Sequence, residues 1–194
     1  MASSDEPEGF RFEEIPVAGV ALAGQGPDLL TGPERDAIQS YALNGFERIN
    51  KALWDQTPIA NALAQCIDAI RSGLMKYPLP TTVRVTREDE ARNMGIVSDE
   101  SAYALIDRKF THLGFLSASG TTNPPRSTRH TDPVILDLIV PAGTPALRLG
   151  ELAEIPDERE VLLIDARSYF VVGVAWDQAR SMWRIHAIVT EDER

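Results

Sequence analysis

Cysteine and histidine are scarce in this sequence. Its 194 residues include one cysteine, Cys66, and three histidines, His112, His130 and His186. A single cysteine excludes an internal disulfide and a cysteine-rich metal site, and it is compatible with a reducing compartment. The histidines lie in no spacing typical of a metal site, and no glycine-rich phosphate loop occurs. We therefore expect no bound metal and no P-loop chemistry.

Long apolar runs and an excess of positive charge are also missing. No uninterrupted apolar stretch approaches the roughly 20 residues of a membrane-spanning helix, so we expect no membrane partner. The net charge of −10 argues against a protein that holds nucleic acid by bulk electrostatics, although a local basic patch stays open. The start, MASSDEPEGFRFEEIP, lacks the basic end and apolar block of a secretory signal. We therefore expect that the protein has no signal peptide and that it acts in the cytoplasm.

What remains is the composition of one globular domain. Hydrophobic residues make up 43% and charged residues 25%, and the length suffices for a single buried core. Residues 1–30 carry glycine, proline and acidic residues without a sustained period, which predicts a tail or an irregular strap. Residues 31–194 would then form one domain.

Three helices are predicted early in this domain. In TGPERDAIQSYALNGFERINKAL, Thr31 and Glu34 fit a capping box, apolar residues recur at helical spacing, and Gly45 is expected to bend or break the helix. In TPIANALAQCIDAIRSGL, Thr57 is the expected cap of a second helix. SDESAYALIDRKF predicts a third helix, capped by its first serine.

Strand-like runs dominate the rest of the chain. TTVRVTRE, PVILDLIVPAG, PALRLGEL, EVLLIDA, SYFVVGVAW and MWRIHAIVT are rich in β-branched or aromatic residues and are separated by glycine, proline and aspartate. The last two flank DQARS, which predicts a hairpin. Helices first and antiparallel strands later predict an α+β fold.

Two carboxylates before the run VLLIDA form the first candidate site. Residues two apart in a strand share a face, so Glu158 and Glu160 would point the same way and Arg159 the opposite way. The apolar residues that follow could desolvate Glu160. Acidic residues at a strand end are more often solvated gatekeepers, so the motif taken alone favours a structural role.

Other polar residues could complete a site. Ser117 and Ser119 follow the strand-like GFL, where serines usually satisfy backbone groups. Arg84 lies in a β-branched run and, if directed inward, needs an anionic partner such as a phosphate. The long polar segment GTTNPPRSTRHTDP carries Arg126 and Arg129, which could also contact phosphates.

Taken in order, these motifs resemble the R-S-E class of mono-ADP-ribosyltransferases, which includes clostridial binary-toxin enzymatic subunits and bacterial and phage exoenzyme-like proteins. The resemblance covers roughly residues 33–190. GFERINKAL matches the family's helical start, TVRV its arginine strand, SAS its Ser-x-Ser, VPAGT its strand end and ERE its E-x-E. Relatives read Tyr-Arg-Gly where Val83 and Val85 flank Arg84, and Arg87 is the alternative arginine.

The resemblance implies two packed antiparallel sheets that form a cleft for NAD, with helices against them. NAD would be a substrate, and its glycosidic bond would break through an oxocarbenium-like state that Glu160 stabilises. Ser117 would orient Glu160, and Arg84 would pair with the NAD phosphates or ribose. The expected NAD contacts are Arg84, Ser117, Ser119, Arg126, Arg129 and Glu160.

The resemblance also implies the acceptor. A guanidinium has a pKa above about 12, so an attacking arginine needs a carboxylate to orient it and accept a proton. Glu158 would do this, and in the family E-x-E accompanies arginine acceptors. The expected activity is mono-ADP-ribosylation of an arginine in a target protein, by an effector delivered into a cell or by a phage protein.

Two alternatives stay open. The first is an NAD glycohydrolase, or a transferase to another acceptor such as a small molecule or a nucleobase; a nucleic-acid partner is not favoured but remains open as acceptor. The second is a catalytically silent interaction domain, which the residues around Arg84 make conceivable.

Overall fold

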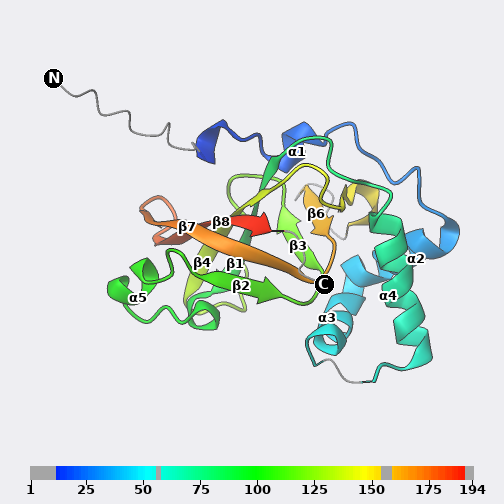
Figure 1. The fold of residues 1–194 in the computed structure, drawn as a ribbon, viewed down its shortest axis with the longest axis horizontal. Helices are drawn as coiled ribbons and strands as arrows, with labels where there is room; N and C mark the ends of the chain where they lie inside the picture. The colour runs from blue at the N-terminus through cyan, green and yellow to red at the C-terminus, as the bar shows by residue number, and fades with distance from the viewer. Residues whose placement is uncertain (1–11, 56–57, 154–158, 191–194) are drawn as a thin grey trace.

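The computed structural model describes residues 12–55, 58–153 and 159–190. In these ranges the chain forms helices and a large sheet (Figure 1). The helical segments are η1 (Phe12–Glu14), α1 (Ala18–Ala21), α2 (Gly32–Ser40), η2 (Tyr41–Gly45), α3 (Phe46–Asp55), α4 (Asn61–Leu74), η3 (Ala91–Met94), α5 (Asp99–Tyr103) and η4 (Gly150–Leu152). The strands are β1 (Val83–Glu90), β2 (Lys109–His112), β3 (Leu116–Ser119), β4 (Pro133–Val140), β5 (Ala146–Arg148), β6 (Glu160–Leu163), β7 (Arg167–Asp177) and β8 (Met182–Thr190).

The sheet has eight strands in the order β2-β7-β8-β4-β1-β3-β6-β5. The α+β class is confirmed, and so is the β7–β8 hairpin. The described strand pairs are antiparallel as expected, except that β4 and β8 pair in parallel. The two separate sheets are not seen among the described strands. Instead β1 and β3 pair at one position, Thr86 with Ser119, and this junction links a group of five strands to a group of three.

The predicted helices form with altered ends. The backbone N–H of Thr31 donates to Glu34 at 2.8 Å, as a capping box requires, and the π-helical turn η2 ends at Gly45. The second helix begins at Asn61, and its expected cap, Thr57, lies outside the described residues. The third helix was expected to reach Phe110, but it ends at Tyr103.

A strand takes the place of that last helical turn. Asp107 has a φ of 68°, which a helix does not allow. The following residues then pair with β7 as β2, from Lys109 opposite Phe170 to His112 opposite Arg167. Tertiary pairing therefore overrides the helical spacing of this segment.

Two apolar clusters enclose β6 from opposite sides. Val161 and Leu163 belong to a cluster that includes apolar residues of β1, β4, β7 and β8, whereas Leu162 and Ile164 pack with α2, α3 and α4. Figure 1 shows these three helices together at one end of the molecule, next to β3 and β6. The helix-facing side of β3 and β6 is therefore the side on which a site can form between sheet and helices.

The segment from residue 12 to residue 22 runs along β1 and reaches the end of β3. The Arg84 N–H donates to the Pro16 carbonyl at 2.9 Å, and the Gly19 N–H donates to the Gly120 carbonyl at 2.8 Å. A Cβ atom on Gly19 would lie 2.5 Å from the Gly120 oxygen, so only glycine permits this approach. The segment thus packs directly beside the Ser-x-Ser strand.

No helix in the described residues combines the length and the apolar character needed to cross a bilayer.

Candidate functional site

Ser117, Ser119 and Glu160 lie on one face of the β3–β6 ladder. Ser119 is directly opposite Glu160 in the register, and Ser117 is opposite Leu162. Residues opposite or two apart share a face, so Ser117 and Glu160 are diagonal neighbours. The Ser117 hydroxyl donates to the Glu160 carboxylate at 2.5 Å. The hydroxyl therefore holds one oxygen of the carboxylate in place.

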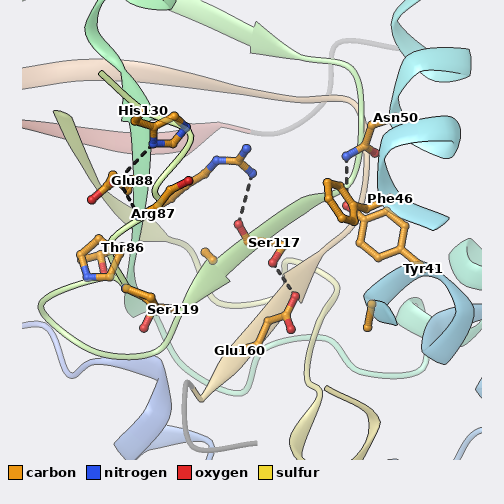
Figure 2. Close-up of a pocket in the computed structure, with 15 residues that line it drawn as sticks. Tyr41, Phe46, Asn50, Thr86, Arg87, Glu88, Ser117, Ser119, His130 and Glu160 are labelled. Carbon is orange, nitrogen blue, oxygen red and sulfur yellow. Dashed lines mark hydrogen bonds and ion pairs between the residues drawn. The ribbon is translucent and has the colours of Figure 1, made fainter. Parts of the chain in front are cut away.

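This face opens into a pocket of about 300 Å³ between the sheet, the helices and the loop of residues 120–132 (Figure 2). Its volume is at the lower end of the range for small-molecule sites. The lining combines hydroxyls, carboxylates, one arginine and aromatic rings. The residues that line it are Tyr41, Ala42, Phe46, Asn50, Thr86, Arg87, Glu88, Ser117, Ala118, Ser119, Pro124, Pro125, Ser127, His130 and Glu160.

Tyr41 and Asn50 form the helical wall and are fixed to the start of β3. The Asn50 side chain accepts from the Phe115 N–H at 3.0 Å and donates to the Tyr41 hydroxyl at 3.0 Å, and this hydroxyl donates to the Phe115 carbonyl at 3.2 Å. Burial, with a further contribution from the charge of Glu160, raises the pKa of Tyr41 to about 12. The phenol therefore stays protonated and can donate throughout the physiological range.

Arg84 does not reach this pocket. Its guanidinium is buried, with Nε 3.2 Å from Asp137 and Nη1 donating to the Phe12 carbonyl at 3.0 Å. Arg87 lines the pocket instead, and its Nη1 donates to the Ser117 carbonyl at 3.2 Å. The N-terminal segment covers Arg84, whose backbone N–H donates to the Pro16 carbonyl and whose side chain donates to the Phe12 carbonyl.

The two loop arginines are held by carboxylates and are not among the lining residues. Arg126 Nε lies 3.4 Å from Glu88, and Arg129 Nη1 lies 2.7 Å from Glu47 on α3. Their side chains are exposed, with 55% and 74% of the side-chain surface accessible.

Glu158 lies outside the described residues. The strand β6 begins at Glu160, and Arg159 has a φ of 52°, in the left-handed region. The strand alternation from which a shared face was predicted therefore does not extend back through Arg159. That Glu158 and Glu160 point the same way stays a prediction.

The pocket offers the groups that a dinucleotide with a diphosphate requires. Arg87 supplies a permanent positive charge for phosphate, and the hydroxyl oxygens of Thr86 and Ser119, which donate to Thr121, are acceptors for ribose hydroxyls. Phe46 offers an apolar face for a base or nicotinamide ring. In the part of the chain that is described, no three metal-ligating side chains cluster.

Sequence reasoning missed several lining residues, and some of them carried a signal. Asn50 belongs to GFERIN, the stretch that resembles the family's helical start, but its side chain was given no role. Tyr41 stood in the apolar period of a helix, which predicts only burial. Glu88 and His130 carried no signal, because they meet only after the loop folds back over β1.

A sequence model of a protein family, described as "ADP-ribosyltransferase exoenzyme", matches residues 19–189. A comparison with curated proteins gave no match.

Solved structures share the fold over almost the whole chain. The C3 exoenzyme of Clostridium limosum is 16% identical with a TM-score of 0.75, covering 95% of this chain and 97% of its own. C3stau2 from S. aureus, solved with NAD, is 19% identical with a TM-score of 0.74, covering 90% and 93%. The toxin BECa of C. perfringens, solved with NADH, is 21% identical with a TM-score of 0.72, covering 90% of this chain and 46% of that one.

Proposed function

The chain belongs to the ADP-ribosyltransferase exoenzyme family, and on this premise we propose that it transfers ADP-ribose from NAD to an arginine of a target protein, with release of nicotinamide. The contact between Ser117 and Glu160 inside the pocket carries the proposal. A carboxylate held by a hydroxyl next to a permanent cation is what a dinucleotide substrate with a labile glycosidic bond needs. NAD in the solved structures of C3stau2, and NADH in those of BECa, support the choice of substrate.

Glu160 is assigned to the reacting sugar. When the bond between nicotinamide and ribose breaks, the electron pair leaves with nicotinamide and positive charge develops on the ribose. The Glu160 carboxylate stabilises this cation and holds a ribose hydroxyl. Ser117 keeps the carboxylate in the orientation that meets the developing charge, so no reorganisation is needed during the reaction.

Arg87 is assigned to the diphosphate in place of Arg84. Arg87 lines the pocket, whereas Arg84 is buried, pairs with Asp137 and donates to the Phe12 carbonyl. A guanidinium binds phosphate through paired hydrogen bonds and fixes the dinucleotide against the sheet. Arg126 and Arg129 pair with Glu88 and Glu47 and do not line the pocket, so they are not assigned to the diphosphate.

Glu158 is assigned to the acceptor. It precedes Glu160 by two residues in the E-x-E motif that the family combines with arginine acceptors. Its carboxylate would orient the incoming guanidinium and take up the proton that is released when the nitrogen bonds to the ribose carbon. The acceptor arginine and the protein that carries it are the second substrate.

The proposal is tested by incubating the protein with labelled NAD and a cell extract and then mapping the label by mass spectrometry. We expect label on arginine side chains, and we expect Glu160→Gln to reduce the rate about 10²- to 10³-fold, as removal of a preorganised electrostatic group does. Transfer that is unaffected by Glu160→Gln would contradict the site. Label confined to other residue types would contradict the acceptor.

A further inference from the structure

Glu88 lies on β1 beside the pocket, and its carboxylate collects groups from the loop that forms the opposite wall. Its Oε1 accepts from the Ser127 N–H at 2.9 Å and lies 3.0 Å from His130 Nδ1. Its Oε2 lies 3.4 Å from Arg126 Nε and 3.8 Å from Arg180 Nη2. We call these five residues the Glu88 cluster; Figure 2 shows the contact between Glu88 and His130 at the edge of the pocket.

The carboxylate is buried while its partners are partly exposed. Only 3% of the Glu88 side-chain surface is accessible, against 24% for His130 and 55% for Arg126. An ionised carboxylate is buried in a protein only where charges and hydrogen bonds compensate its lost hydration. Here almost all of that compensation comes from a loop that has no helix or strand of its own. Burial of Glu88 and the position of the loop therefore depend on each other.

The cluster also reaches the hairpin of β7 and β8. Arg180 lies in the hairpin turn and donates from Nη2 to the Pro124 carbonyl at 3.0 Å. The loop is thus held at residue 124 through Arg180 and at residues 126 to 130 through Glu88. These contacts bracket the loop residues that face the pocket, namely Pro124, Pro125, Ser127 and His130.

A second carboxylate that contacts the same loop differs in its surroundings. Glu47 pairs with Arg129 at 2.7 Å, but 67% of the Glu47 side chain and 74% of the Arg129 side chain are accessible. Exposed ion pairs of this kind contribute little to stability, because water screens the charges and both side chains lose conformational freedom. The Glu88 and Glu47 contacts therefore differ in burial and can be compared directly, while Glu90 holds residues 131–132 and Arg184 holds residues 122–123 at the two ends of the loop.

We propose that Glu88 is a positioning residue for NAD: by binding Ser127, His130 and Arg126 it fixes the 120–132 loop as a preformed wall of the NAD pocket. The assignment rests on the proposed function for the identity of the ligand. Glu88 acts through the loop and contributes no atom to the reacting centre. Because the loop already stands in place, NAD does not lose binding free energy in ordering it.

A corollary concerns charge. Glu88 pairs with Arg126 and Arg180, neither of which is among the residues that line the pocket, whereas Arg87 is. The diphosphate is then directed to Arg87 at the junction of β1 and β3. Loss of the Glu88 charge would offer it a second cation at a wrong position.

The experiment compares Glu88→Gln and Glu88→Ala with the matched control Glu47→Gln. Kinetics with NAD give KM and kcat, calorimetry gives NAD affinity, and amide hydrogen exchange reports on residues 120–132. We expect KM for NAD to rise about 10- to 100-fold in the Glu88 variants, by analogy with residues that orient metal ligands, with kcat within about threefold. Exchange in the loop should increase in the order wild type, Glu88→Gln, Glu88→Ala, because glutamine can still accept from Ser127. Glu47→Gln should leave KM within about twofold of wild type.

His130→Gln and Arg126→Gln approach the same contacts from the exposed loop, and they serve if the Glu88 variants fail to fold. They should also raise KM and loop exchange. If all of these variants showed the same loop exchange as Glu47→Gln, the claim that Glu88 anchors the loop would be overturned. Faster exchange without a change in KM or NAD affinity would reduce Glu88 to a structural residue and overturn the positioning role. A wild-type protein that does not bind NAD would refute the proposed function and the NAD role together, while the exchange data would still decide the anchor.

Discussion

Ser117 and Glu160 are diagonal neighbours across the β3–β6 ladder, and the serine hydroxyl donates to the glutamate carboxylate at 2.5 Å. Ser119 lies directly opposite Glu160, and its hydroxyl lies 2.8 Å from that of Thr121. The two serines of the Ser-x-Ser motif thus differ in what they hold. The first fixes the carboxylate, and the second contacts the start of the loop.

Ser117→Ala should lower kcat for ADP-ribose transfer more than Ser119→Ala does. A hydrogen bond to a charged group contributes about 1.5–3 kcal/mol, so we expect a loss of about 10- to 100-fold for Ser117→Ala. Steady-state kinetics of both variants measure the effect. Equal losses in the two serine variants would speak against orientation of Glu160 by Ser117.

Arg87→Ala and Arg84→Met should have different consequences. Arg87 lines the pocket, so its loss should weaken NAD binding about 10- to 100-fold in calorimetry while the protein stays folded. Arg84 is buried against Asp137, so its loss should lower the free energy of unfolding by up to about 3–5 kcal/mol. Asp137 keeps Arg184 at 2.8 Å, which moderates the penalty. Denaturant unfolding measures the loss of stability. If an Arg84→Met protein were fully stable but bound NAD more weakly, Arg84 would belong to the NAD site.

Glu158→Gln should separate two reactions. Transfer to arginine needs a carboxylate that takes the guanidinium proton, whereas attack by water on the ribose cation does not. We expect transfer to fall about 10²-fold or more, by analogy with other general bases, and slow hydrolysis of NAD to persist. Chromatography of labelled products measures both rates. If both fell together, Glu158 would serve NAD rather than the acceptor.

Glu34→Gln should change the acid stability of the protein. Burial raises the pKa of Glu34, but the contacts from Lys76, Ser72 and Thr31 outweigh it and lower the pKa to about 2. A carboxyl whose pKa is lower in the folded state stabilises the fold above its unfolded pKa and loses this contribution as the pH falls towards 2. The variant should be less stable than wild type at pH 7, by about 1–3 kcal/mol, and the difference should shrink between pH 4.5 and pH 2. Thermal unfolding across this range tests it; a difference that is independent of pH would exclude the mechanism.

Local signals in the sequence predicted those parts of the fold that local interactions decide. Thr31 and Glu34 indicated a helix start, and EVLLIDA indicated a strand, as the capping contact and β6 confirm. The helix predicted after Tyr103 was wrong, because pairing with β7 makes part of this segment a strand. The parallel pairing of β4 with β8 joins strands far apart in the chain, so no spacing encodes it.

The candidate site shows the same division. Ser117 and Glu160 were predicted from ordered motifs, and the structure brings them into contact. The choice between Arg84 and Arg87 depended on the contacts that the N-terminal segment makes with Arg84, and Phe12 makes one of them from 72 residues away. Glu88 and His130 meet only because the loop folds back, and a pattern within one segment cannot reveal such a contact.

The strand β8 lies between β4 and β7, inside the sheet, although it is formed by residues 182–190 near the C-terminal end of the chain. During synthesis, β4 and β7 would each lack one neighbouring strand until these residues emerge. The sheet therefore cannot close one strand at a time behind the ribosome, and its central ladder must form late. A chain arrested before residue 182 would expose two unpaired strand edges, which makes it a substrate for chaperones or proteases.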